Sequence, residues 1–149
     1  MLQNETRAAY GYFRKIPTRW MDNDIYGHVN NVIYYSYVDT VSNAYLIEEG
    51  GLDIHSDPII GIAVESHCNY YKSLEFPETI DAGLRVGHLG RTSVRYEVGL
   101  FSESSETVCA AAHFVHVFVD RETNTPVPIP EKLRSCLSRI VHHAAPGEP

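Results

Sequence analysis

The sequence has 149 residues and a formal net charge of −7, with 44% hydrophobic and 21% charged residues. A chain of this length and composition is expected to fold as one globular domain with a real core. The acidic balance and the lack of a local basic run argue against nucleic-acid binding, and no uncharged apolar run approaches the ~18 residues of a membrane span.

The three cysteines, Cys68, Cys109 and Cys136, have no spacing typical of a metal site or a redox motif. Their number is odd and no secretory signal precedes them, so we expect reduced, buried thiols in a cytoplasmic protein. His113 and His116 lie three residues apart on a predicted strand and therefore point to opposite faces, which argues against a metal pair. The sequence predicts no bound metal.

The first eleven residues are polar, and we expect them to be frayed. Residues 12–20 contain β-forming bulk, which predicts a strand, and Pro17 assigns this strand to a sheet edge or a bulge. A polar turn at residues 22–31, rich in Asp, Asn, Gly and His, follows. A carboxylate, an imidazole and several amides therefore arrive together at the start of the next element.

That element is a long amphipathic helix of roughly 18–20 residues, about 27–30 Å in length. Its apolar face is predicted from residues at helical spacing, namely Tyr34, Tyr37, Val38, Val41 and Tyr45. Its opposite face carries Ser36, Thr40, Ser42 and Asn43. Asn30 and Asn31 are suitable N-cap residues, and Gly50 and Gly51 favour termination.

The following segments alternate between apolar and polar residues, which is typical of half-buried strands. In the first, residues 60–71, the more apolar face comprises Ile62, Val64, Ser66, Cys68 and Tyr70. Three more strands are predicted at residues 79–89, 92–101 and 107–120. The residues expected to point inward from the first two of these are Ile80, Ala82, Leu84, Val86, Val94, Tyr96, Val98 and Leu100.

Residues 131–142 have a short helical pattern, with Leu133, Leu137 and Ile140 on one face, and residues 144–149 form a tail. The order is therefore strand, long helix and four strands joined by short turns, which predicts an α+β layer fold. Because no repeat or linker divides the chain, we expect one domain over residues 1–149, with its core at about residues 12–130.

The turn, the helix and the strand order resemble the hotdog fold, in which a curled antiparallel sheet wraps one long helix. Within this fold, the chain resembles the 4-hydroxybenzoyl-CoA thioesterase-like acyl-CoA thioesterases. The matching stretch is Trp20-Met-Asp-Asn-Asp24-Ile-Tyr-Gly-His28-Val-Asn-Asn31, followed by Tyr34 and Tyr35. Weaker matches follow in the expected order, at Asn69-Tyr-Tyr-Lys-Ser-Leu, His88-Leu-Gly-Arg91-Thr-Ser93 and Phe118-Val-Asp-Arg-Glu-Thr.

In that family an aspartate of the turn carries the chemistry, and by position it is Asp24 here. Asp22 competes for this role but aligns less well. The family polarises the thioester carbonyl with a backbone N–H at the start of the long helix, near Asn31. Plant acyl-carrier-protein thioesterases have a similar turn with an Asn two residues before the His. That position is Tyr26 here, so the role of His28 stays open. The three alternatives are that His28 orients Asp24, that it donates a proton to the leaving thiolate, or that it holds the turn.

The chemistry explains why these residue types occur together. A thioester needs a nucleophile or an activated water, which a carboxylate can supply. The developing oxyanion needs a donor, which the unpaired N–H groups and positive dipole end of a helix provide. Asp24 ahead of a helix that begins near Asn31 delivers both. The plain alternative is that Asp24 and Asn31 only cap the turn and the helix.

The CoA portion of the implied substrate carries phosphates, which guanidinium and hydroxyl groups bind well. Arg91, Thr92 and Ser93 at a strand start are the candidates for this contact. Asp39, two turns into the helix, is a candidate contact of the acyl group, and Glu65 is a candidate strand residue supplied by a partner subunit. Each of them is otherwise an exposed surface group.

We therefore expect an acyl-CoA thioesterase with Asp24 as general base or nucleophile and without a cofactor, CoA being part of the substrate. Two alternatives stay open, a hotdog hydratase or dehydratase acting on acyl thioesters and a non-catalytic acyl-CoA-binding protein. A single hotdog sheet leaves an exposed edge and half a cleft, so we expect a homodimer or a dimer of dimers.

Overall fold

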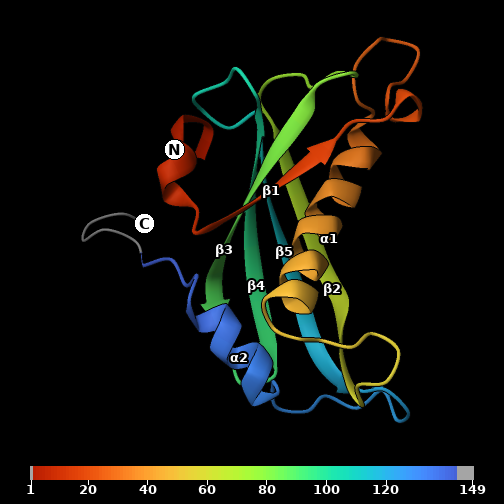
Figure 1. Cartoon of the computed structure of the whole chain (residues 1–149), viewed down its shortest axis with the longest axis vertical. Helices are drawn as coiled ribbons and strands as arrows, with labels where there is room; N and C mark the ends of the chain where they lie inside the picture. The colour runs from red at the N-terminus through yellow and green to blue at the C-terminus, as the bar shows by residue number, and fades with distance from the viewer. Residues whose placement is uncertain (1, 144–149) are drawn as a thin grey trace.

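In a computed structural model, which describes residues 2–143, five antiparallel strands form one sheet and a long helix crosses one of its faces (Figure 1). The strands are β1 (Tyr12–Pro17), β2 (Ile59–Tyr70), β3 (Thr79–Leu89), β4 (Ser93–Ser102) and β5 (Ala110–Asp120), in the spatial order β1-β3-β4-β5-β2. The helices are α1 (Asn31–Glu48) and α2 (Glu131–Ser138). The α+β prediction is confirmed, and the predicted tail lies outside the described residues.

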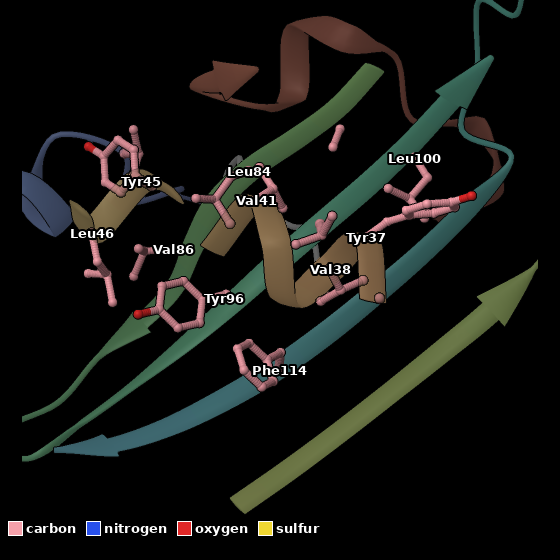
Figure 2. Packing of buried hydrophobic residues seen from close by; sticks show 14 of the residues in the cluster. Tyr37, Val38, Val41, Tyr45, Leu46, Leu84, Val86, Tyr96, Leu100 and Phe114 are labelled. Carbon is pink, nitrogen blue, oxygen red and sulfur yellow. The ribbon is translucent and has the colours of Figure 1, made fainter. Parts of the chain in front are cut away.

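Helix α1 lays its predicted apolar face on the sheet. Figure 2 shows Val38, Val41 and Leu46 directed toward Val86, Tyr96 and Leu100, from β3 and β4. All eight residues predicted to point inward from β3 and β4 are fully buried. One residue differs from the prediction: Ser42, expected on the polar face, is fully buried, because its hydroxyl donates to the Val38 carbonyl at 2.9 Å and needs no water.

Strand β2 contains a β-bulge that changes which of its residues face the helix. Opposite β5, the register shifts between Ala63 and Glu65, leaving Val64 as the extra residue, 57% exposed. A bulge reverses the alternation of side chains beyond it. Ser66 and Cys68 therefore share a face with Ala63 rather than with Ile62, and the prediction of one continuous apolar face through Ile62 and Val64 is wrong.

The N-terminal residues are ordered against the outer face of the sheet, which corrects the expectation of a frayed segment. The Tyr10 ring lies over Gly83 and Gly99, which pair with each other across β3 and β4. A Cβ at Gly99 would lie 2.6 Å from Tyr10 Cζ, so only glycine leaves room for the ring. Arg85, beneath Tyr10, pairs with Glu5 at 3.0 Å.

At the opposite end of the sheet, α2 buries Leu133 and Leu137 as predicted. All three cysteines are buried and unpaired, as predicted. His116 lies inside the core while His113 lies on the outer face, so the two do point apart. Within residues 2–143, no group of three or more His, Cys, Asp or Glu side chains is arranged to hold a metal ion. None of the described helices has the length and apolar character to cross a membrane.

Candidate active site

The turn that precedes α1 is built on Asp22, which is fully buried. The Asp22 carboxylate accepts hydrogen bonds from the backbone N–H and the guanidinium of Arg19 and, at 2.7 Å, from the Tyr37 phenol. Burial alone would raise the pKa of Asp22, but these donors bring its pKa below the ordinary value. With both carboxylate oxygens occupied, Asp22 supports the turn, and the competing assignment of Asp22 as the reactive aspartate loses its basis.

Asp24 lies on the rim of the turn and is partly exposed. Its backbone N–H donates to the His28 carbonyl at 3.0 Å, and its carbonyl accepts from the Gly27 N–H at 3.1 Å. Gly27 has a φ of +83°, a conformation that glycine adopts without strain. The Asp24 carboxylate accepts from the Tyr26 N–H at 2.9 Å and from the Asn30 side-chain amide at 3.4 Å. The tight turn therefore points a carboxylate outward beside the helix start.

The start of α1 leaves one backbone donor without a partner in the chain. Asn30 is the N-cap residue, and its side-chain oxygen accepts from the Val32 N–H at 3.0 Å. Its carbonyl accepts from the Ile33 N–H at 2.9 Å. The Asn31 N–H has no hydrogen-bond acceptor among residues 2–143. An unpaired N–H at the positive end of a helix dipole can stabilise an oxyanion.

Asp24, His28 and Asn31, the three predicted catalytic residues, line one open pocket of about 450 Å³. The rest of its wall comes from residues of the two matching motifs to which the sequence analysis assigned no role in this pocket, namely Tyr26, Val29, Tyr34, Tyr70, Tyr71, Lys72 and Ser73. The two sides are joined by backbone pairing, because the Val29 N–H donates to the Leu74 carbonyl at 2.8 Å. A carboxylate, an imidazole and a free backbone donor thus share one solvent-accessible space, which suits attack on an activated carbonyl.

Tyr70 lies in one of the weaker motif matches and on the predicted apolar face of its strand, but the sequence did not assign it to this pocket. It ends β2, and its phenol donates to the Asn31 carbonyl at 3.0 Å. Its ring packs edge-on against the Tyr34 ring, with 4.9 Å between the two ring centroids. Partial burial raises the pKa of Tyr70 above the ordinary phenol value. A local pattern gives no signal for its contact with Asn31, since the two residues are 39 positions apart.

The predicted CoA-binding residues lie away from this pocket within the same chain. Arg91 and Thr92 lie in the turn between β3 and β4, and Ser93 begins β4, at the end of the sheet beside α2. The loop between β1 and α1, which holds Asp24, lies near the opposite end (Figure 1). Along β4, Leu100 lies seven residue steps from Ser93, a span of about 24 Å at 3.4 Å per residue. The chain therefore does not bring these three residues together with Asp24.

Asp39 and Glu65 occupy two further places. Asp39 lines an open hollow of about 440 Å³ between α1 and β2, where its carboxylate accepts from the Asn43 amide at 2.9 Å. Glu65 lies on the outer face of the sheet and contacts the His113 imidazole at 2.9 Å. Neither residue lines the pocket around Asp24.

The chain was compared with known families and structures. The family model of the thioesterase-like superfamily matches residues 18–137. A comparison with curated proteins gives no match. The crystal structure of the PA5185 protein from Pseudomonas aeruginosa strain PAO1 is similar, with 51% sequence identity, coverage of 94% of this chain and 98% of that chain, and a TM-score of 0.92.

Two further structures are named as thioesterases. The PA2801 protein, a putative thioesterase from Pseudomonas aeruginosa, has 28% identity, covers 87% of this chain and 98% of its own, and has a TM-score of 0.79. Slr0204, a 1,4-dihydroxy-2-naphthoyl-CoA thioesterase from Synechocystis, has 12% sequence identity, and the match covers 85% of this chain and 95% of that chain. Its TM-score of 0.77 shows the shared fold. Because the family model spans most of the chain, this hotdog protein belongs to the thioesterase-like superfamily, as the sequence predicted.

Proposed function

We propose that the protein hydrolyses an acyl-CoA thioester to the free acid and CoA at the pocket around Asp24. The observation that carries this proposal is the convergence of the Asp24 carboxylate and the unpaired Asn31 N–H on one open pocket. The membership of the thioesterase-like superfamily supports the reaction class. The CoA portion rests on the motif resemblance and on the name of the Synechocystis neighbour, a CoA thioesterase.

In the proposed reaction, the thioester carbonyl oxygen accepts the Asn31 N–H as negative charge develops on it. The Asp24 carboxylate either takes a proton from the water that attacks the carbonyl carbon or attacks that carbon itself. Collapse of the tetrahedral intermediate then breaks the C–S bond, and the CoA thiolate takes up a proton. In the second route this collapse leaves a mixed anhydride, which a water molecule hydrolyses to the free acid and the free Asp24 carboxylate. We assign the proton transfer to the thiolate to His28, which lines the same pocket.

We also propose that the active unit is a homodimer joined along β2. Within residues 2–143, strand β2 has a free edge, because β5 is its one neighbour in the sheet. Large apolar side chains are exposed on β2, at Val64 and Tyr70, and beside it, at Tyr26 and Tyr35. An unprotected edge strand flanked by exposed apolar groups is typical of a surface that pairs with a second chain.

A two-fold axis through the middle of β2 would explain the separation of the candidate CoA-binding residues. Antiparallel pairing sets the Tyr70 end of one β2 beside the Ile59 end of the other. Measured along the strands, the turn that holds Arg91 in the partner subunit would then lie level with Asp24. Measured across the sheet, that turn ends β3 and begins β4, and β4 lies two strand spacings, about 10 Å, from the β2 edge. CoA could extend from the Asp24 pocket of one subunit to Arg91 of the partner subunit. The hollow beside Asp39, at the same interface, is then a place for the acyl group.

The first experiment follows thiol release with a disulfide-exchange dye over a panel of acyl-CoA esters. The wild type should release thiol, and Asp24→Asn should lower kcat by about 10³-fold, the usual size of a lost general base, while still binding a non-hydrolysable thioether analogue. Asp53→Asn is the matched control, because Asp53 accepts the His55 N–H in a turn of the same kind, also at 2.9 Å. Near-wild-type turnover by Asp24→Asn would overturn the assignment.

Two further results separate the alternatives. Hydration of an enoyl-CoA, followed by loss of its ultraviolet absorbance, would indicate a hydratase, and saturable binding without thiol release would indicate a binding protein. For the dimer, Val64→Lys should shift the mass measured by light scattering from two chains to one and abolish hydrolysis. A monomeric wild type with full activity would contradict the shared site.

A further inference from the structure

We propose that Tyr70 and Asn30 are positioning residues, which hold the Asp24 carboxylate through a continuous chain of hydrogen bonds that begins on strand β2. The proposal rests on the proposed function, because it assigns these two residues a task at the same pocket. It also connects that pocket to the strand whose free edge we expect to pair with a second subunit.

The first link runs from β2 to the helix. The Tyr70 phenol donates to the Asn31 carbonyl at 3.0 Å, and the ring is held by its edge-on contact with Tyr34 at 4.9 Å. The Asn31 carbonyl belongs to the same peptide unit as the Val32 N–H. Accepting a hydrogen bond at the carbonyl polarises that unit and strengthens its N–H as a donor.

The second link passes through the Asn30 side chain. Its oxygen accepts from the Val32 N–H at 3.0 Å, and its nitrogen donates to the Asp24 carboxylate at 3.4 Å. The amide can be placed in one orientation only, since a backbone N–H needs an acceptor and a carboxylate needs a donor. The helix cap and the contact with the reactive carboxylate are therefore two ends of one side chain.

The consequence for Asp24 concerns how its carboxylate is oriented. One oxygen accepts the Tyr26 N–H at 2.9 Å and the other accepts the Asn30 amide. Two donors on different oxygens fix the rotation of the carboxylate, so the loss of one donor lets it turn away from the position that attack on the carbonyl requires. The other titratable groups that line the pocket are His28, Tyr26, Tyr34, Tyr71 and Lys72, and both variants described below retain all of them.

Two variants break the chain at different points, and a third is the control. Asn30→Ser keeps a capping oxygen but removes the amide donor to Asp24. Tyr70→Phe removes only the phenol. Tyr45→Phe makes the same change at the other end of α1, where the phenol donates to the Cys136 carbonyl, and so reports the effect of losing such a bond far from the pocket.

We expect Asn30→Ser to lower kcat by about 10-fold, the equivalent of one charge-assisted hydrogen bond, with KM changed less than about twofold. Tyr70→Phe should lower kcat by a smaller factor, again with little change in KM. Tyr45→Phe should lower Tm and leave kcat and KM unchanged.

A second readout does not need turnover. In ¹³C NMR at pH 7, the Asp24 carboxyl signal, assigned by its loss in Asp24→Asn, should change its chemical shift in Asn30→Ser and by less in Tyr70→Phe, and should stay in place in Tyr45→Phe. An unchanged chemical shift together with an unchanged kcat in Asn30→Ser would overturn the proposal. If the wild type released no thiol from any ester, the proposed function would fail, and the NMR shift would still decide whether the hydrogen-bond chain acts on Asp24.

Discussion

The Tyr37 phenol donates a 2.7 Å hydrogen bond to the Asp22 carboxylate, which is wholly inaccessible to solvent. This bond joins the second turn of α1 to the loop in front of it. Arg19 completes the arrangement with an ion pair at 2.9 Å, and the Asp22 carbonyl accepts the Asn30 N–H at 2.9 Å. The geometry of the whole candidate site therefore depends on a carboxylate that no substrate can reach.

Asp22→Asn should lower the free energy of unfolding by about 2–4 kcal/mol, the cost of losing a buried carboxylate with charged partners. The Asp22 pKa is depressed in the folded chain, so its contribution is complete above about pH 4 and is lost as the pH falls below that value. Urea unfolding at pH 7 and pH 3 measures both effects. The difference between Asp22→Asn and wild type should shrink at the lower pH, and a constant difference would contradict this explanation.

His116 should make the protein less stable in mild acid. Burial lowers the pKa of His116 to about 4, against about 6.5 in an unfolded chain. Between these values the unfolded chain binds a proton that the folded chain excludes, so stability is complete above about pH 6.5 and falls toward pH 4 by up to ~3 kcal/mol. His116→Gln should flatten this part of the curve of unfolding free energy against pH. A wild-type and a variant curve that remain parallel would refute the assignment.

Gly99→Ala should destabilise the protein by about 1–3 kcal/mol, the usual cost of overpacking, because the new methyl group would lie 2.6 Å from Tyr10 Cζ. The test is a double-mutant cycle with Tyr10→Ala. In the background that lacks the ring, the same substitution should cost about 0.5 kcal/mol or less. An equal cost in both backgrounds would place the strain elsewhere than at the Tyr10 ring.

Arg91→Ala should raise KM for acyl-CoA by about 10-fold, the value of one hydrogen bond to a charged phosphate, without lowering kcat. Its side chain is exposed and forms no ion pair with another described residue. Hydrolysis of the corresponding N-acetylcysteamine thioester, which has no phosphates, is the control and should be unaffected. Equal losses on both substrates would exclude a phosphate contact.

Periodicity predicted the parts of the fold in which each residue follows its neighbours. The apolar residues of α1 recur every three or four positions, and those of β3 and β4 every second position, so Val41, Leu84 and Val98 could be placed in the core directly. The same reasoning failed at Val64, where an extra residue reverses the alternation. It also failed at Ser42, where a side chain bonds its own helix.

The candidate site was predictable where its residues are adjacent in sequence. Asp24, His28 and Asn31 occur within one turn, so the resemblance of this turn to the thioesterase motif already indicated them. Tyr70 and Lys72 lie in a weaker motif match, and their place in the same pocket depends on tertiary packing that no local spacing encodes. Within a single chain, Arg91 lies far from Asp24, so a contact of both residues with one CoA ester would require a second subunit.

The contact of Tyr10 with the glycine pair also determines how the chain tolerates shortening. Residues 2–10 cover Phe101 and the hollow above Gly83 and Gly99, and they supply Glu5 as the partner of the buried Arg85. A chain that began at residue 11 would expose an aromatic hollow beside the Arg85 guanidinium, which would keep Glu97 but lose Glu5 as a carboxylate partner. Such a surface would bind aromatic side chains of other protein molecules. An N-terminally trimmed preparation would therefore aggregate although its core is intact.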